Sequence, residues 1–420
     1  MSTVALPACL NRPDGRPCVR ARVARRIVER IARQIPVRIE LPDGSVLGGG
    51  AVAHPGSDDD VPVIQIVRPD AFFARLGHQP KIGFGEAYMA GDWRPAPGTD
   101  LGVALKPFAE RIATAVPRPL RRLRTLVEER VPHSQRNTVA GSRTNIEAHY
   151  DLSNDLFAAF LDPSLAYSSA MFDEARPWAD QALEEAQVRK VDAALDLAKV
   201  GPGMRVLEIG TGWGTLAIRA AQRGAHVTTL TLSREQADLA QQRVRAAGVE
   251  DLVDIRLQDY REAGGTYDAI VSVEMIEAVG EEYWPTYFRA IDALLAPGGT
   301  ASVQAILMSH ECYLATRRSF SWIQKHIFPG GIIPSMHAIE TTTSAHTSLR
   351  IAETQHFGQH YAETLRRWRR AFTEHWPHIH DLGFDEPFHR MWEFYLAYSE
   401  SGFASGYLDV AQIRLQRVGA

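Results

Sequence analysis

The sequence predicts an α/β protein in which a doubly wound sheet follows a smaller N-terminal α+β domain. Strand and helix patterns alternate between residues 204 and 307, which is typical of a parallel sheet with helices on both faces. Gly210, Gly212 and Gly214 directly follow the first of these strands and permit a tight turn into the next helix. Residues 1–112 are patterned differently, with short β-branched runs beside a helical segment.

Composition limits the classes of protein that need to be considered. The chain has 420 residues, of which 45% are hydrophobic and 23% charged, as expected for a globular protein of two or three domains. Its formal net charge of −4 argues against electrostatic binding to nucleic acid. No apolar run reaches the roughly 18 residues that span a bilayer, and the N-terminus lacks a secretory signal, so a cytoplasmic protein is expected. The cysteines fit neither a disulfide framework nor a zinc site, and no metal-binding cluster is expected.

The small α+β domain is predicted over residues 1–112. An arginine-rich segment near its start places apolar side chains at near-helical spacing, at Val23, Ile27, Ile31 and Ile35. Two β-branched runs, residues 37–41 and 63–67, predict strands. A segment rich in glycine and aromatic residues follows at 83–93.

A linker is predicted over residues 113–142, followed by a larger domain at 143–420. Apolar residues on one helical face of the linker alternate with Arg121, Arg122 and Arg124. A solvated linker helix accounts for this pattern, and so does a surface that meets anionic phospholipid headgroups.

The segment 204–221 carries the strongest functional signal. An apolar strand leads into glycines spaced G-x-G-x-G, not the G-x-G-x-x-G of a dinucleotide-binding fold. A dinucleotide enzyme would place an acidic residue about 20 residues later, but residues 229–233 contain none. The acidic residue here is Glu208, inside the motif, which is typical of motif I of class I S-adenosylmethionine (SAM) methyltransferases.

The elements after this motif continue the alternation. Strands are predicted at 226–232, 252–257, 267–273 and 301–307, with helices at 234–247 and 283–295. Ligands of such sheets bind at the carboxyl ends of the strands. Glu208, Gln236, Gln258 and Asp259 are all predicted to lie there.

Upstream of this motif, the segment 149–172 resembles the cyclopropane fatty-acid synthase family, which includes the mycolic-acid methyltransferases. Further matches follow in the same order along the chain, at 231–236, 258–261, 271–280, 327–331 and 357–361. The resemblance covers roughly residues 145–415, and residues 83–93 resemble the smaller domain of the bacterial synthases.

The resemblance implies a Rossmann-like class I SAM methyltransferase domain behind an N-terminal domain that engages lipid. It implies a homodimer, peripherally associated with the membrane, that alkylates the cis double bond of unsaturated, oleoyl-type phospholipid chains at the membrane surface. By position, the residues that would contact SAM are Tyr167, Ser168, Glu208, Gly210, Gly212, Gly214, Thr231, Leu232, Ser233, Gln236, Gln258 and Asp259.

Elementary chemistry sets the demands on such a site. An alkene is a weak, uncharged nucleophile, so it must be held about 3–3.5 Å from the methyl group that it attacks. Water must be excluded, because attack leaves a carbocation. Aromatic side chains downstream of the sheet can line a channel for the acyl chain, although ordinary helical core explains them equally well: Phe320, Trp322, Phe328, Phe357, Tyr361, Trp368, Trp392, Phe394, Tyr395 and Tyr398.

The sequence departs from the family where a proton must be removed. In the cyclopropane synthases the expected base is a bound bicarbonate, held by a cysteine, a glutamate, a histidine, an isoleucine and a tyrosine. Glu277, Ile306 and Tyr361 match three of these positions, but Ser169 stands at the cysteine position and Gln304 at the histidine position. The bicarbonate site is therefore expected to be altered.

Two carboxylates are candidate replacements for this base. Glu277 is carried over from the family motif, and burial in an apolar pocket would raise its pKa and suit it to proton transfer. Glu147 precedes the family signature by two residues. Glu147 also fits a capping box begun by Thr144, so a structural role is an equal alternative.

The altered site favours a different product. If a hydride shift precedes loss of the methyl proton, the product is a 10-methylene chain, which a reductase would convert to a methyl branch. The main prediction is therefore a 10-methylene-forming fatty-acid methyltransferase. A cyclopropane synthase, a small-molecule methyltransferase and a non-catalytic lipid-binding protein are the alternatives.

Overall fold

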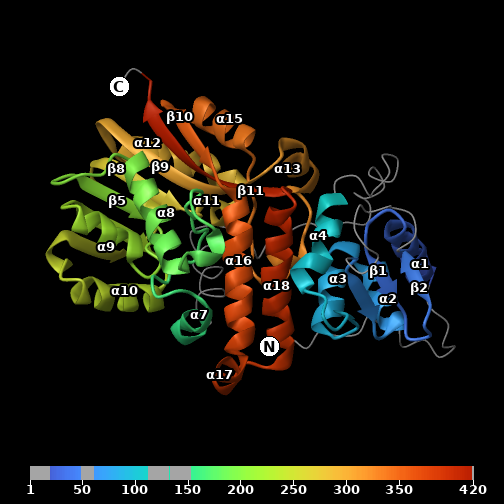
Figure 1. Cartoon of the computed structure of the whole chain (residues 1–420). Coiled ribbons are helices and arrows are strands. Elements are labelled where there is room, and N and C mark those ends of the chain that lie inside the picture. Colours follow the sequence, from blue (N-terminus) through green and yellow to red (C-terminus); the bar gives the residue numbers. More distant parts are fainter. Residues whose placement is uncertain (1–18, 49–60, 112–131, 133–152, 419–420) are drawn as a thin grey trace. The chain divides into compact units, whose positions relative to one another are not determined.

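The computed structural model describes residues 19–48, 61–111, 132 and 153–418 (Figure 1). The chain forms two compact units. The first contains Met1–Arg130, Ser319–Ile327 and Trp376–Tyr407, and the second contains Val131–Arg318, Phe328–His375 and Leu408–Ala420. The boundaries expected at residues 112 and 142 stay a prediction, because both positions lie outside the described residues.

The first unit has a four-stranded sheet with the order β2-β1-β3-β4. The expected strands at 37–41 and 63–67 are confirmed as β1 and β3, which pair in parallel, while β2 and β4 flank them in antiparallel pairing. Proline begins two of its helices, which suits a residue whose missing N–H has no intrahelical role there. The elements are α1 (Val19–Ala32), β1 (Arg38–Glu40), β2 (Val46–Gly48), β3 (Val63–Ile66), α2 (Pro69–His78), α3 (Pro80–Met89), β4 (Trp93–Pro95), α4 (Leu101–Arg111), α14 (Trp322–His326), α17 (Trp376–Asp381) and α18 (Glu386–Ala404).

Residues far apart in sequence complete this unit. Helix α18 packs against α3 and α4, and α14 also packs against α3. The contact is close at Gly85, where an added Cβ would lie 2.6 Å from the Trp322 indole. Hydrogen bonds fix the same packing: Tyr88 donates to Glu393 over 2.6 Å, and Ser401 donates to the Gly102 carbonyl over 2.9 Å.

The helix expected near the start of the chain is confirmed as α1. Its larger apolar residues, however, do not form its buried face. Alanines at 21, 24 and 32 are buried, so α1 lies close to α2 through small side chains. Val19, Val23 and Ile27 are instead exposed, in a stripe with a spacing of four residues.

The second unit is built on a seven-stranded sheet with the order β10-β11-β9-β8-β5-β6-β7. Five strands from β7 to β9 are parallel, as expected, but β11 pairs antiparallel with both β9 and β10. The strands predicted from the sequence are therefore parallel as expected, and two strands that were not predicted, β10 and β11, make the sheet mixed. The strands are β5 (Arg205–Ile209), β6 (His226–Thr231), β7 (Val253–Leu257), β8 (Tyr267–Val273), β9 (Leu295–Met308), β10 (Leu349–His356) and β11 (Leu408–Arg417).

Strands β10 and β11 were not predicted from the sequence, and the reason is physical. Strand β10 is mostly exposed and polar, so it lacks the apolar run that reveals a central strand. Strand β11 adds to the sheet only after the chain has returned through two long helices, and it pairs with β9 from Leu408 to Gln416. The periodicity of a local segment does not indicate which distant strand that segment will pair with.

Helices cover both faces of this sheet (Figure 1). Alternate residues of each central strand enter opposite cores: Val206 packs with α8 and α9, whereas Leu207 packs with α12 and α15. Burial on both faces explains why successive residues are apolar at 206–207 in β5 and at 269–271 in β8. The helices are α7 (Asn154–Phe160), α8 (Leu183–Leu197), α9 (Thr215–Gln222), α10 (Arg234–Ala246), α11 (Ile276–Val279), α12 (Trp284–Leu294), α13 (His310–Thr316), α15 (Met336–His346) and α16 (Gly358–Glu374), with single 3₁₀ turns at Trp178–Asp180, Glu250–Leu252, Tyr260–Glu262 and Glu281–Tyr283.

Candidate active site

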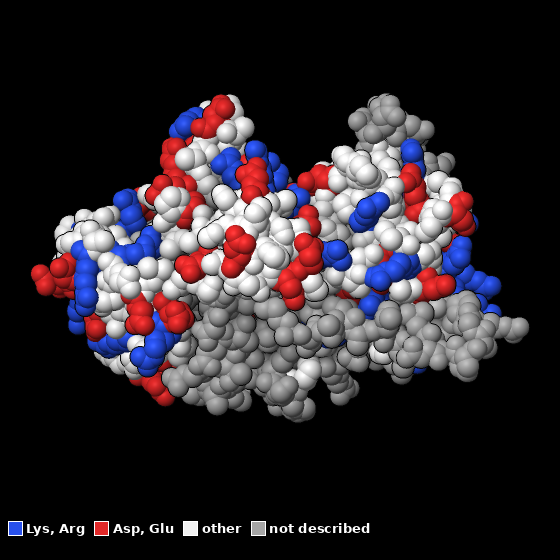
Figure 2. Space-filling view, turned by 90° about the horizontal axis from the view of Figure 1, so that it is seen from below, with Lys and Arg blue, Asp and Glu red and all other residues white. Residues whose placement is uncertain are grey.

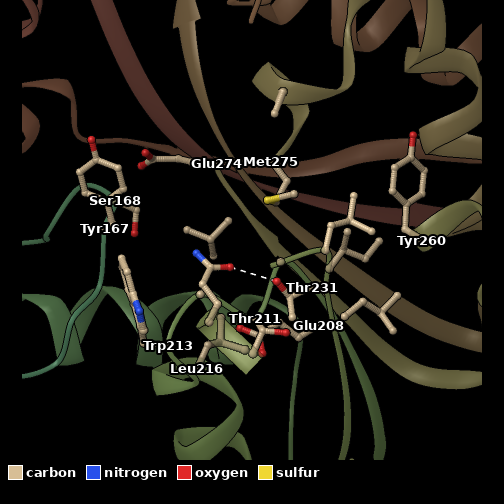
Figure 3. A pocket seen from close by; sticks show the side chains of 18 of the residues that line it. Tyr167, Ser168, Glu208, Thr211, Trp213, Leu216, Thr231, Tyr260, Glu274 and Met275 are labelled. Carbon is tan, nitrogen blue, oxygen red and sulfur yellow. Dashed lines mark hydrogen bonds between the residues drawn. The ribbon is translucent and has the colours of Figure 1, made fainter. Parts of the chain in front are cut away.

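A pocket opens at the carboxyl ends of β5, β6 and β8, as the alternation of strands and helices predicted (Figure 3). Its wall comes from the loop before α8, the glycine loop after β5, the end of β6, the segment after β7 and the start of α11. Ten of the twelve expected cofactor residues line it: Tyr167, Ser168, Glu208, Gly210, Gly212, Thr231, Leu232, Gln236, Gln258 and Asp259.

The glycine loop has the backbone geometry that its sequence requires. Gly210, Gly212 and Gly214 all have positive φ, at +100°, +50° and +87°. A Cβ at Gly210 would lie 2.6 Å from the Met275 sulfur, whereas at Gly212 nothing lies within 4 Å. Gly214 does not line the pocket but packs close to Ala240 of α10, so its role is to let α9 approach α10.

Glu208 is buried beneath this loop. Its carboxylate accepts a 2.6 Å hydrogen bond from the Thr229 hydroxyl, which also contacts the Thr211 hydroxyl at 2.7 Å. Burial raises the pKa of Glu208 to about 8, against the opposing effects of the Thr229 hydrogen bond and the Lys190 charge. A buried carboxyl group is thus available to a ligand that carries hydroxyl or amino donors.

The other polar residues of the pocket are held by short-range hydrogen bonds. Thr231 donates to the Gln236 side chain over 3.0 Å, and the Ser233 hydroxyl caps α10 by accepting from the Gln236 N–H. Ser233 therefore supports the wall without lining it. Asp259 is buried and bound by Arg261 at 2.6 Å, so the carboxylate is fixed where the segment after β7 meets the pocket.

Three of the residues assigned to the altered base site meet at one carboxylate, that of Glu274. The Ser169 N–H and the Gln304 amide donate to its Oε1 over 2.9 Å and 2.8 Å. The Tyr361 hydroxyl donates to its Oε2 over 2.7 Å. The side-chain hydroxyl of Ser169 does not take part, because it donates to the Ala170 carbonyl.

Glu274 was not among the site residues predicted from the sequence, so this cluster was missed. Two signals were present: an acidic residue directly follows β8, and it does so at the edge where ligands bind. The third signal is structural. Glu274 has φ +51°, a conformation that non-glycine residues adopt rarely and that often marks functional positions.

Glu277 lies three residues further on, at the start of α11, and does not line the pocket. One carboxyl oxygen accepts from the Ile306 N–H over 2.5 Å, and the other is buried without a hydrogen-bond partner among the described residues. Burial and then the charge of Glu274 raise the pKa of Glu277 to about 8. Glu147 lies outside the described residues, so the choice between a catalytic and a capping role for it stays open.

Lys190 is a further residue that sequence analysis did not single out. It lies on α8 among apolar residues, is buried, lines the pocket and donates to the Ser168 hydroxyl over 2.5 Å. Burial lowers its pKa to about 8, while the charges of Glu274, Asp162 and Glu208 act in the opposite direction. A lysine within an apolar helix face was the available signal.

The aromatic residues expected to line an acyl channel are divided between the two units. Phe320, Trp322, Trp392, Phe394, Tyr395 and Tyr398 belong to the first unit, and Phe328, Phe357, Tyr361 and Trp368 to the second. Within the first, Trp322 meets Phe394 edge-on at 4.8 Å, and within the second, Tyr361 meets Trp368 edge-on at 6.2 Å. These contacts are those of packed cores, and a channel stays a prediction. No described helix is both long and apolar enough to cross a membrane.

The chain is similar to a known family and to several known proteins. Residues 137–413 match the family described as mycolic acid cyclopropane synthetase. Tuberculostearic acid methyltransferase UfaA1 of Mycobacterium tuberculosis is 49% identical over 419 residues, which cover 98% of this chain and 95% of the relative. The cyclopropane-fatty-acyl-phospholipid synthase of Escherichia coli is 34% identical, over 84% of this chain and 87% of the relative.

Solved structures show the same architecture. The crystal structure of mycolic acid cyclopropane synthase CmaA1, complexed with SAH and CTAB, aligns with a TM-score of 0.60 at 31% identity. The alignment covers 68% of this chain and 99% of that one. Coclaurine N-methyltransferase, bound to N-methylheliamine and SAH, aligns with a TM-score of 0.55 at 18% identity, a likeness of fold alone.

Proposed function

Because this chain belongs to the mycolic acid cyclopropane synthetase family, we propose that it methylates the cis double bond of unsaturated phospholipid chains with SAM as methyl donor. The favoured substrate is an oleoyl-type chain, and the favoured product is its 10-methylene derivative. One observation in the structure supports this proposal most directly. The pocket built on Glu208 and the glycine loop is continuous with Glu274, around which the altered base site is assembled.

The residues of the pocket fit SAM. Open space beside Gly212 and positive φ at three glycines leave room for a ligand against the backbone. The buried carboxyl of Glu208 can receive hydroxyl or amino donors, and the carboxylate of Glu274 in the wall favours a cationic group. When bound, SAM supplies a methyl group on a positively charged sulfur.

The chain's own residues would then control the acyl group. Attack by the double bond forms a carbon–carbon bond to the methyl group and leaves a cation on the adjacent carbon. A nearby carboxylate stabilises this cation, and exclusion of water prevents its capture as an alcohol. Loss of a methyl proton after a hydride shift gives the methylene product, whereas loss without the shift closes a cyclopropane ring.

The two relatives support the methylene product more strongly than the cyclopropane product. The protein named for tuberculostearic acid shares 49% identity over nearly the whole chain, and the one named for cyclopropane synthesis shares 34%. Ser169 and Gln304, in place of the cysteine and histidine of a bicarbonate site, favour the methylene product. That product still needs hydride and a proton to become a methyl branch, so a reductase is the expected consumer.

The deciding experiment is product analysis with the purified full chain, SAM and vesicles of dioleoyl phosphatidylglycerol. The methylene and cyclopropane products have the same mass, so ozonolysis or proton NMR must follow mass spectrometry. Ozone cleaves the exocyclic double bond to a ketone and leaves a cyclopropane intact. A methylene product confirms the main proposal, and a cyclopropane as the sole product supports the alternative. Turnover of small soluble acceptors with none on vesicles would refute both.

Peripheral association with the membrane is supported by helix α1. Its exposed stripe, Val19, Val23 and Ile27, is flanked by the exposed arginines Arg20, Arg22, Arg26 and Arg30. In Figure 2, Lys and Arg side chains lie along the right-hand edge of the molecule, the edge at which Figure 1 shows α1. An apolar stripe with basic flanks is typical of helices that lie in an anionic bilayer surface. A homodimer is expected from the family resemblance alone.

A further inference from the structure

Glu274 is placed in the pocket by the end of a buried strand. It follows Val273 of β8 directly, and Met275, Ala278 and Val279 after it also line the pocket. Figure 3 shows its side chain extending toward Tyr167 and Ser168, on the far side of the pocket from Tyr260. The carboxylate thus stands at the wall of the proposed methyl-transfer site.

The hydrogen bonds to Glu274 are distributed unevenly between its two oxygens. Each carboxylate oxygen can accept about two hydrogen bonds. Oε1 accepts two, from the Ser169 N–H and the Gln304 amide, and is therefore filled. Among the described residues Oε2 accepts one, from the Tyr361 hydroxyl, and so keeps one acceptor position. A carboxylate held in this way is oriented and still able to take up one proton.

The surroundings tune this carboxylate for proton transfer. Burial raises the pKa of Glu274, and the donors Ser169, Tyr361 and Gln304 together with the Lys190 charge oppose that rise. A carboxylate with a raised pKa is a stronger base, provided that it remains ionised. The three donors act toward that condition, since each of them stabilises the charged form.

Glu277 complements this arrangement. It accepts from two backbone N–H groups, those of Ile306 and Glu277 itself, where Glu274 has three donors, and one of its oxygens is buried without a partner among the described residues. Two buried carboxylates this close do not readily ionise together. Glu274, with more donors, is the member of the pair that carries the charge, and Glu277 is the member that stays protonated.

We propose that the Glu274 carboxylate is the base that removes the proton from the transferred methyl group, so that the enzyme carries its base in its own chain. This inference rests on the proposed function. The methyl carbon leaves sulfur with formation of the new carbon–carbon bond, and the sulfur keeps the electron pair. A hydride shifts from the methylated carbon to the neighbouring cationic carbon, which moves the cation to the carbon that bears the methyl group. One methyl C–H bond then supplies the electrons of the new double bond, and its proton passes to Oε2 of Glu274. The resulting carboxylic acid releases this proton to solvent before the next turnover.

The same residues explain why an external base is unnecessary. Positions 169, 304 and 361 are those that the family resemblance assigns to a bicarbonate site, and here all three donate to Glu274. The donors that would hold a free anion are therefore occupied by a side chain. Turnover of the wild-type enzyme is expected to be the same in bicarbonate-free buffer as with added bicarbonate.

The first test is Glu274→Gln, assayed on dioleoyl phosphatidylglycerol vesicles beside Glu282→Gln as matched control. Glu282 is exposed and lies in the same unit, so its variant makes the same chemical change away from the pocket. We expect Glu274→Gln to lower turnover by about 100-fold or more, a typical loss for a general base, while SAH affinity changes by less than about threefold. Turnover above about a third of wild type in Glu274→Gln would overturn the proposal.

The second test is chemical rescue of Glu274→Gly. Glycine adopts φ +51° without strain, and its lack of a side chain leaves the Ser169, Gln304 and Tyr361 donors facing an empty space. Formate, acetate or bicarbonate should enter this space and restore turnover at least tenfold over the variant alone, with no effect on the wild type. A folded Glu274→Gly that binds SAH but responds to none of these anions would contradict the proposal, as would a wild-type enzyme that requires bicarbonate. If the wild type itself yields no product from the vesicles, it is the proposed function that fails.

Discussion

Glu208 shows how a single buried carboxyl can make cofactor affinity depend on pH. Its pKa is raised to about 8 by burial, so much of it is protonated at neutral pH in the empty pocket. Donors on a ligand bond more strongly to the charged form, so binding favours loss of the proton. SAH affinity should therefore rise from pH 6.5 to 8.5.

The variant Glu208→Gln isolates this effect. We expect it to bind SAH about 10- to 100-fold more weakly at pH 8.5, the range of a hydrogen bond to a charged group, and to lose the rise with pH. Isothermal titration calorimetry at three pH values measures both. An unchanged pH dependence in the variant would assign the titration to another group.

Glu277 leads to a prediction about stability. Its pKa in the folded protein, about 8, is above its ordinary value of 4.5, so the folded state holds a proton that the unfolded chain has lost between these values. Its contribution to stability is complete below pH 4.5 and is lost as pH rises through 8. Glu277→Gln keeps an acceptor for the Ile306 N–H and removes the titration.

Thermal unfolding at pH 5.5 and pH 8.5 tests this sign. We expect the wild type to lose more stability over this interval than Glu277→Gln, by up to about 3 kcal/mol. Glu208 titrates in the same direction and remains in both proteins, so only the difference between them is informative. Equal losses would show that Glu277 is ionised in the folded protein.

At the scale of elements, α1 shows that amphipathic spacing predicts a helix but does not predict which face of that helix is buried. The spacing of Val23 and Ile27 predicted a helix, and the helix is confirmed. The buried side is instead formed by alanines, because a close approach of α1 to α2 admits only small side chains. The larger apolar residues stay exposed and can contact a surface outside this unit.

Double substitution of Val23 and Ile27 by serine should weaken binding to anionic vesicles by about tenfold. The reason is that two of the three exposed large apolar side chains of α1 are lost. Val103→Ser in α4 is the matched control, since Val103 is an exposed valine on another helix of the same unit. Vesicle co-sedimentation measures binding, and SAH affinity should be equal in all three proteins. Undiminished sedimentation of the double variant would exclude α1 as the membrane contact.

At the scale of the whole molecule, the first unit is assembled from three separate segments of the chain. The α18 helix contributes Glu393 and Ser401 to hydrogen bonds with residues before 112, and α14 contributes Lys325 to an ion pair with Glu86 at 2.6 Å. A fragment of residues 143–420 would therefore expose the face of α18 that packs on α3 and α4.

We expect that fragment to unfold at least about 10 °C below the full chain, equivalent to a loss of several kcal/mol for a protein of this size. Scanning calorimetry and binding of a hydrophobic dye measure the change. A fragment with the melting temperature of the full chain would show that residues 143–420 form an independent domain, as the sequence division implies.

The local features of this protein follow from its sequence alone. The strands β5, β6, β7 and β8, the glycine loop and the position of Glu208 at a strand end depend on side-chain periodicity and backbone freedom, which neighbouring residues determine. Only the tertiary structure decided that Ser169, Gln304 and Tyr361 meet at Glu274 and that β11 runs antiparallel beside β9. The three hydrogen bonds to Glu274 join residues 30 to 105 positions apart. Packing across the sheet selects these partners, and no local sequence pattern indicates them.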